Sequence, residues 1–392
     1  MQQLTDSQNT THFSTAVGEV PGRREQRATR VMFFLAGFAT AVWAALVPFA
    51  RLNTGVDDAT LGLLLLCLGG GALVAMPLTG VLTTRWGCRK VLALAILLFS
   101  LILPWLAVIP NTALLALALL MFGIGVGTTD CAMNVQAILV EKAAGKAMMS
   151  GFHGFYSIGG IIGAGAMSGM MSLGLSPLAA CLLSVITAIM LLLTHLSGLL
   201  TYANPPEGPS FAIPRGAVLV LGLICFAVFL AEGAVLDWSA VFLIEHRSMV
   251  QAQGALGFAC FAAAMTLGRL TGDRVVTTLG SQPVVMLGAA LAVAGLMLVV
   301  WLPYWLAALL GYALIGLGCS NIVPIMFSAI GRQTSMSQAA AVPAVTTLGY
   351  LGILAGPASI GFIAQHSSLS SAFLVVAALL ALVGLSAKTV KV

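Results

Sequence analysis

The sequence predicts an all-α membrane protein with twelve transmembrane helices, arranged as two six-helix bundles with both termini in the cytoplasm. Three observations predict this fold class. First, 60% of the 392 residues are hydrophobic and 7% are charged, whereas a soluble domain carries about 25% charged residues. Second, apolar runs of helical length recur along the chain. Third, the basic residues between these runs gather on one side of the predicted membrane.

The apolar runs define the expected helices. A membrane-spanning helix needs about 20 mainly apolar residues, and twelve runs separated by Gly, Pro or charge have this length. The expected helices lie at roughly 30–51, 60–83, 90–109, 112–138, 148–172, 177–200, 215–237, 254–274, 283–302, 305–330, 339–364 and 369–386. The interior segment rich in Pro and polar residues divides them six and six. The predicted parts are a polar cytoplasmic tail (1–29), an N-terminal bundle (30–200), a cytoplasmic central loop (201–214) and a C-terminal bundle with a short tail (215–392).

The Lys and Arg residues predict the orientation. With the N-terminus inside, fifteen of the 17 basic residues fall on the cytoplasmic side, and only Arg51 and Arg247 fall outside. Such an excess is the positive-inside pattern of membrane proteins. The net charge of +5 is therefore a sign of topology and does not indicate a nucleic-acid partner.

Several function classes have no sequence support. The seven cysteines form no CxxC pair, so we expect free thiols, no disulfide framework and no metal site. The glycine-rich GIGVG is not part of a strand–helix dinucleotide unit, and neither a Walker lysine motif nor HExxH occurs. We therefore expect a protein that is not an enzyme and has no cofactor.

Asp130 is the first candidate for function. It is the one formal charge between Val91 and Val140, and a charge at bilayer depth is costly unless protein or water faces it. The next charge, Glu141, lies about 16 Å further along a helix, roughly half of a hydrocarbon core. Because burial disfavours the charged form of a carboxyl group, Asp130 is a candidate proton carrier. A neutral Asp bonded to Thr or Asn for packing is the alternative.

The two halves of the sequence repeat weakly, and the repeat identifies the residue that corresponds to Asp130 in the second half. Residues 125–130 (GVGTTD) align with 316–321 (GLGCSN), so that Asp130 corresponds to Asn321. Parallel six-helix repeats are one known plan for transporters, which bind substrate and ions near the middle of the membrane.

Other membrane-embedded polar residues are weaker candidates. Glu232 is the second candidate for proton coupling. We expect a neutral, hydroxyl-bearing ligand to meet aromatic and amide groups in the centre, although each of these groups can also serve packing alone. The candidate substrate-binding residues are Trp43, Asn134, Tyr156, Asn321, Thr347 and Tyr350.

A glycine-rich basic segment between the second and third expected helices carries a family resemblance. Its glycines and cations are Gly80, Arg85, Gly87, Arg89 and Lys90. With Leu82, they resemble the signature loop of the major facilitator superfamily (G-x-L-x-D-R-x-G-R-R/K). The acidic position of that signature is Thr84 here. The second half carries Arg269 and Asp273, which are four residues apart and share one helix face. We expect these residues to take part in gating.

The resemblance implies a function. The acid in the fourth helix and the segment AEGAVLDWSAVFL in the seventh are similar to the fucose-permease-like group, in which a fourth-helix acid takes part in proton coupling. The implied protein is a monomeric secondary transporter in a bacterial inner membrane. Its partners would be the lipid bilayer, protons and a small polar solute such as a sugar or sugar derivative. A proton-driven exporter and a non-transporting sensor remain alternatives, and the solute, direction and stoichiometry stay open.

Overall fold

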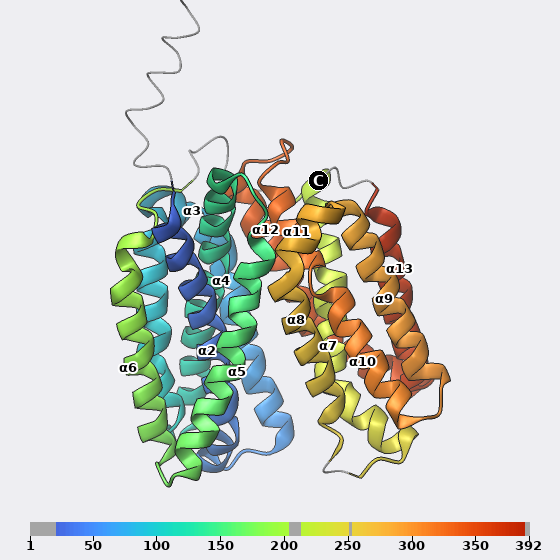
Figure 1. Ribbon diagram of the computed structural model, residues 1–392. Helices are drawn as coiled ribbons and strands as arrows, with labels where there is room; N and C mark the ends of the chain where they lie inside the picture. The colour runs from blue at the N-terminus through green and yellow to red at the C-terminus, as the bar shows by residue number, and fades with distance from the viewer. Residues whose placement is uncertain (1–20, 204–212, 251–252, 389–392) are drawn as a thin grey trace, which may run out of the picture.

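The computed structural model describes residues 21–203, 213–250 and 253–388. All regular structure in these ranges is helical, and nine of the described helices are long and apolar enough to cross a membrane (Figure 1). Most of the expected N-terminal tail and of the central loop lies outside the described residues.

The N-terminal bundle contains helices α2 to α6, which Figure 1 draws in blue to green. The expected second and third helices are one long element, α3, with helical segments on either side of Gly87. The bounds are α2 Arg23–Thr54, α3 Asp58–Leu106, α4 Thr112–Ala144, α5 Met149–Ser172 and α6 Pro177–His195, followed by the 3-10 turn η1 Leu196–Gly198.

The C-terminal bundle contains helices α7 to α13. The expected tenth helix is interrupted at Ser320 and Asn321, where α10 ends and α11 begins. The bounds are α7 Ala217–Arg247, α8 Leu256–Leu279, α9 Ser281–Trp301, α10 Trp305–Cys319, α11 Ile322–Ile330, α12 Gln338–His366 and α13 Leu369–Ser386.

Two helices are longer than their apolar runs. Helix α2 begins at Arg23, before the expected start near residue 30, and Glu25 accepts a hydrogen bond of 2.6 Å from the Gly22 amide at this end. Helix α7 continues about three turns past the expected end near residue 237 and stops at Arg247. The Arg247 guanidinium donates to the carbonyls of Val299 and Val300 in α9. Polar side chains thus extend both helices beyond their apolar segments.

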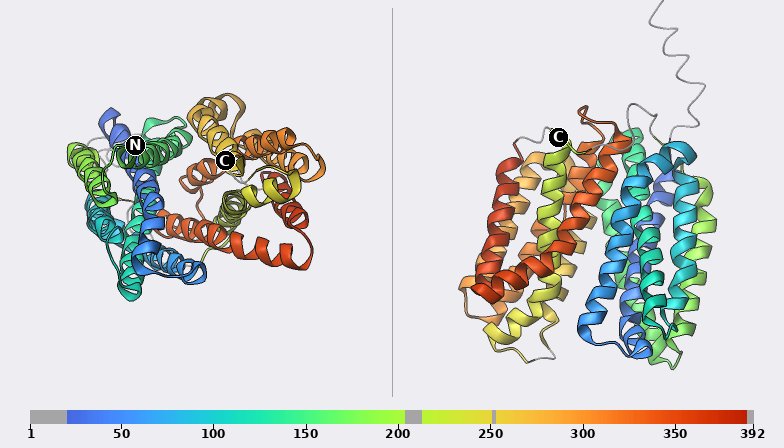
Figure 2. Two further views of the ribbon diagram at one scale, coloured as in Figure 1. Left: turned by 90° about the horizontal axis from the view of Figure 1, so that it is seen from below. Right: turned by 180° about the vertical axis from the view of Figure 1, so that it is seen from behind.

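The two bundles stand side by side, with both described chain ends at the same end of the molecule (Figures 1 and 2). We call this the termini end and the opposite one the far end. The bundles meet where α3 packs on α12 and α5 packs on α8, with further contacts of α4 and α5 to α11. Within the described residues, no comparable packing joins α2 to α7.

Helix α4 is fixed at both ends. Asn111 accepts a hydrogen bond of 3.0 Å from the Leu114 amide at its start, and Gly145 ends it in the left-handed conformation with φ of 60°. Such caps satisfy backbone groups that have no partner within the helix. Asp130 is therefore held in the middle of α4, as the nineteenth of 33 residues.

Gly87 makes the bend between the two segments of α3 possible. Its φ of 75° is a conformation that residues with a Cβ atom rarely adopt. A Cβ atom at this position would also overlap the carbonyl oxygen of Thr201. The neighbouring Arg89 donates hydrogen bonds to the carbonyls of Leu199 (2.9 Å) and Ser197 (2.8 Å). The bend is thus held tightly against the turn that follows α6.

Gly87→Ala should lower the stability of the folded protein by about 2–3 kcal/mol, because it adds a steric overlap to an unfavourable backbone conformation. The melting temperature of the purified protein in detergent measures this effect. Gly145→Ala is the matched control, because Gly145 also has a positive φ but a Cβ atom there would meet nothing within 4 Å. Equal losses in the two variants would show that the overlap with Thr201 contributes nothing.

Candidate functional site

The Asp130 carboxylate lies deep in the molecule, and none of the described residues pairs with it. Its side chain is partly exposed, although it stands at the middle of α4. Among the described residues, no hydrogen bond or ion pair engages the carboxylate. The backbone carbonyl of Asp130 accepts a hydrogen bond of 2.9 Å from the Asn134 side chain. The carboxylate itself is therefore available to a proton or a ligand.

Two tyrosines, one from each bundle, accompany this carboxylate. Tyr156 of α5 and Tyr350 of α12 are both partly exposed and both lie within electrostatic range of Asp130. Thr40 of α2 lies beside the Tyr156 hydroxyl. The centre of the interface therefore combines an acid with two phenol groups.

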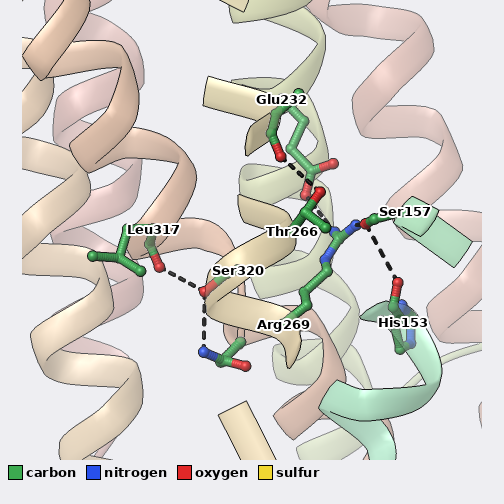
Figure 3. A network of polar contacts seen from close by, with 9 residues as sticks. His153, Ser157, Glu232, Thr266, Arg269, Leu317 and Ser320 are labelled. Atoms are coloured by element: carbon green, nitrogen blue, oxygen red, sulfur yellow. Dashed lines mark hydrogen bonds and ion pairs between the residues drawn. The ribbon is translucent and has the colours of Figure 1, made fainter. Parts of the chain in front are cut away.

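A second polar group surrounds Arg269 of α8 (Figure 3). Arg269 pairs with Glu232 of α7 at 3.4 Å, and their side chains are 8% and 16% exposed. It also donates a hydrogen bond of 3.1 Å to Ser157 of α5, whose hydroxyl donates in turn to the His153 carbonyl at 3.4 Å. One guanidinium thus links the two bundles at the level of the buried acids.

These groups form one region, which we call the central region, and its acidic residues outnumber its basic ones. Tyr156 lies within electrostatic range of Arg269 and Glu232 as well as Asp130. Arg269 offsets Glu232, and no cation pairs with Asp130 among the described residues. The region therefore carries one negative charge when Asp130 is ionised and none when it is protonated.

The His153 ring contributes packing to this region. It is buried, with its centroid 5.1 Å from the Phe33 ring and 5.9 Å from the Phe327 ring. Because Phe33 belongs to α2 and Phe327 to α11, the ring stands between the two bundles. Its Nε2 atom has no hydrogen-bond partner among the residues that the structure describes.

The other sequence candidates lie in less accessible places. Trp43 is 5% exposed and packs inside the N-terminal bundle, 6.3 Å from the Phe122 ring. Asn134 is 1% exposed. Asn321 is 8% exposed and donates to the Gly268 carbonyl at 3.1 Å. Thr347 is partly buried, and its hydroxyl finds no hydrogen-bond partner within the described part of the chain. Of the predicted substrate-binding residues, Tyr156 and Tyr350 are the two that lie partly exposed near Asp130 in this conformation.

The gating candidates other than Arg269 lie at the termini end. The Asp273 carboxylate of α8 accepts a hydrogen bond of 3.0 Å from the Gly151 amide, in the first turn of α5. An acid in this position also interacts favourably with the positive end of the helix dipole. Arg85 and Lys90 are exposed, and Arg89 holds the bend at Gly87. Asp273 therefore ties the C-terminal bundle to the N-terminal one.

Among the described residues, no ion pair occurs at the equivalent contact in the other half. Gly80 of α3 packs so closely on α12 that a Cβ atom would overlap the Ala339 carbonyl oxygen. Thr84, at the acidic position of the signature, donates its hydroxyl to the Gly80 carbonyl at 2.8 Å, within its own helix. This seam therefore depends on close packing.

The sequence predicts a gating role for Arg269, but the structure brings this residue to the central region. Ser157 and Thr40 were not predicted. The sequence does indicate a buried position for Arg269, because this residue follows the apolar segment FACFAAAMTLG. A charge that follows such a segment is expected inside the membrane, by the same argument that singles out Asp130. Ser157 and Thr40 offer no such signal, because small hydroxyl residues are common in membrane helices.

The fold and the site define a helical membrane protein with a polar centre between two bundles. The family model described as Major Facilitator Superfamily matches residues 31–274. The chain therefore belongs to the major facilitator superfamily.

Individual proteins are similar over nearly the whole length. An uncharacterized MFS-type transporter of Yersinia pestis is 52% identical over 94% of this chain and 97% of its own. The crystal structure of the E. coli fucose:proton symporter FucP has a TM-score of 0.77 at 18% identity, covering 94% of this chain and 98% of that one. The human organic anion transporter MFSD10 has a TM-score of 0.74 at 16% identity, covering 94% and 100%. At these identities the two structures show the fold alone.

Arg269→Gln should destabilise the protein by about 1–3 kcal/mol, because it leaves the mostly buried Glu232 carboxylate without its counter-charge. The double variant Arg269→Gln/Glu232→Gln should recover part of the loss. A double-mutant cycle of melting temperatures measures the coupling. If the double variant loses the sum of the two single losses, the pair has no energetic coupling.

Proposed function

We propose that this protein is a secondary transporter that carries a small polar, uncharged solute together with a proton across the bacterial inner membrane. Twelve transmembrane helices in two bundles, with both termini in the cytoplasm, would alternately expose the central region to either side. The observation that carries the proposal is the unpaired Asp130 carboxylate, which lies mid-helix beside Tyr156 and Tyr350.

The charge of the region favours a proton as the coupled ion. With Asp130 ionised, the region carries an unbalanced charge, and closing it away from water is costly. Protonation of Asp130 removes this charge and lowers the cost of passing through a closed state. Proton binding on one side and release on the other would therefore drive the bundle movement.

The same charge balance favours an uncharged solute. An anionic solute would meet the Asp130 carboxylate, while the guanidinium of Arg269 is already engaged by Glu232 and Ser157. The Tyr156 and Tyr350 hydroxyls can donate and accept hydrogen bonds, and their rings offer apolar faces, a combination that suits a multi-hydroxyl ligand. The fold likeness to a fucose:proton symporter supports this solute class.

The conformation fits one stage of an alternating-access cycle. The bundles are tied at the termini end, through Asp273 and Gly151 and through the seam of α3 and α12. With the termini in the cytoplasm, this is the state closed toward the cytoplasm. Solute and proton would then enter from the far end.

Asp130→Asn should abolish proton-driven accumulation, because an amide cannot exchange a proton over the physiological range. A thermal-shift screen of neutral solutes on the purified protein first identifies a ligand, since binding stabilises the folded state by mass action. Uptake of this ligand into proteoliposomes with an imposed pH gradient then measures coupling. We expect the variant to retain solute exchange at equal concentrations but to lose accumulation.

Asp237→Asn is the matched control, because Asp237 is an exposed acid of α7 outside the central region. It should accumulate solute as the unchanged protein does. Accumulation by Asp130→Asn would contradict the coupling role of Asp130. Outward pumping alone would favour an exporter, and a ligand that binds without exchange would favour a sensor.

Asp273→Asn should loosen the closed termini end, because it removes the charge that faces the first turn of α5. Helix-dipole contacts of this kind are worth up to about 2 kcal/mol, so the open population should rise by up to roughly 30-fold. Cys131, buried beside Asp130, is the reporter. A membrane-impermeant thiol reagent applied to inside-out vesicles measures its labelling rate by mass spectrometry.

Asp57→Asn provides the control for this measurement, since Asp57 caps the start of α3 at the far end by accepting from the Thr60 amide at 2.9 Å. It should leave the labelling rate of Cys131 unchanged. An unchanged rate in Asp273→Asn would show that this carboxylate does not hold the termini end closed.

A further inference from the structure

We propose that a cavity at the termini end, formed jointly by the two bundles, binds a phosphate-bearing anion. The cavity has a volume of about 600 Å³. It lies apart from the central region, and none of the residues around Asp130 lines it. Its polar lining includes Lys142, Lys146, Thr277, Ser281, Ser328 and Arg332.

The basic residues reach this cavity from both bundles. Lys142 belongs to the last turn of α4, and Lys146 to the connection between α4 and α5. Arg332 follows α11 on the other side. Among the described residues, no ion pair or side-chain hydrogen bond engages these three cations. They are free to meet a ligand.

The carboxylate on the lining does not neutralise these cations. Glu141 is 9% exposed, and one of its oxygens accepts hydrogen bonds of 2.8 Å from the amides of Met148 and Met149. It thereby holds the connection that carries Lys146. With three cations and one carboxylate, the lining has a net positive charge.

The helix ends around the cavity add donors. Ser281 begins α9, a helix of 21 residues whose positive dipole end lies at the cavity. The hydroxyls of Ser281 and Ser328 can donate to an oxyanion. Several charged and neutral donors around one space suit a group with several oxygens and more than one negative charge, and phosphate has this chemistry.

The positive-inside pattern accounts for cations on this face but not for their convergence on a cavity between the bundles. The two bundles are in close contact beside this cavity, since a Cβ atom at Gly331 would come within 2.9 Å of Ile138 in the other bundle. If the bundles separate at this end, Arg332 moves away from Lys142 and Lys146. A bridging anion would therefore favour the state closed at the termini end.

A second basic cavity on the same face provides an internal comparison. Arg23, Arg24 and Arg27 line a cavity of about 410 Å³ together with residues of α6 and η1. All of these elements belong to the N-terminal bundle. This cavity has as many basic residues as the first one but does not bridge the bundles.

The test measures the melting temperature of the full chain in nanodiscs, with and without sodium pyrophosphate. Phosphatidylcholine discs test the free anion, and discs of phosphatidylcholine and phosphatidylglycerol in equal parts test a lipid headgroup. Anion binding should raise the melting temperature by mass action and weaken as salt is added. Lys142→Gln/Lys146→Gln and Arg332→Gln should each weaken binding, by roughly tenfold for each removed charge.

The control is Arg23→Gln/Arg24→Gln/Arg27→Gln, which removes basic charge from the other cavity and should keep the response. A response to pyrophosphate alone assigns the site to a soluble anion, and a response to phosphatidylglycerol alone assigns it to a lipid. The proposal is overturned if neither probe stabilises the protein, or if the control loses the response as fully as the cavity variants. Binding is measured without transport, so this result is independent of the proposed transport function.

Discussion

A charged group inside an apolar helical bundle is stable only where protein or water faces it, and this constraint organises the centre of the molecule. Arg269 and Glu232 meet it by pairing with each other. No partner engages the Asp130 carboxylate among the described residues, and this residue is instead partly exposed beside Tyr156 and Tyr350. The surrounding helices can be almost wholly apolar because their few charges are concentrated here and at the helix ends.

The two halves of the chain stabilise their buried charged groups differently, although they share a sequence repeat. At the position of Asp130 the second half has Asn321, which lies between α10 and α11 and donates to the Gly268 carbonyl. The N-terminal bundle thus contributes an unpaired acid, while the C-terminal bundle contributes an ion pair. A protonation change at Asp130 therefore alters the net charge of the centre, and the paired charges of the other half can stay in place.

The sequence predicts the helical class and most helix positions, because long apolar runs leave few alternatives in a membrane. It places helix ends less well where polar residues continue a helix, as α7 does to Arg247. It also singles out Asp130, since one charge in an apolar run is conspicuous. The inward or outward direction of Trp43 and Asn134 could not be predicted, because an apolar helix gives little sign of which face meets the other bundle.

Two helices, α5 and α8, are absent from the nine most apolar spans, and their composition has a physical reason. They face each other across the two bundles, where Ser157 contacts Arg269 and Gly151 contacts Asp273. A helix that must separate from a partner benefits from polar contacts, which water can replace on opening. The polar residues that lower the hydropathy of these helices therefore lie on the surface between the bundles.

The two contacts at the termini end differ in mechanical character. The bond from the Gly151 amide to Asp273 is directional, so a small shift breaks it. Gly80 lies against the start of α12 in close van der Waals contact, and non-directional packing of this kind tolerates rotation. The contact between α3 and α12 would therefore persist as the axis of rotation, while the bond between Gly151 and Asp273 would break. The bundles would swing about the line of α3 and α12, and the gap would widen first between α5 and α8.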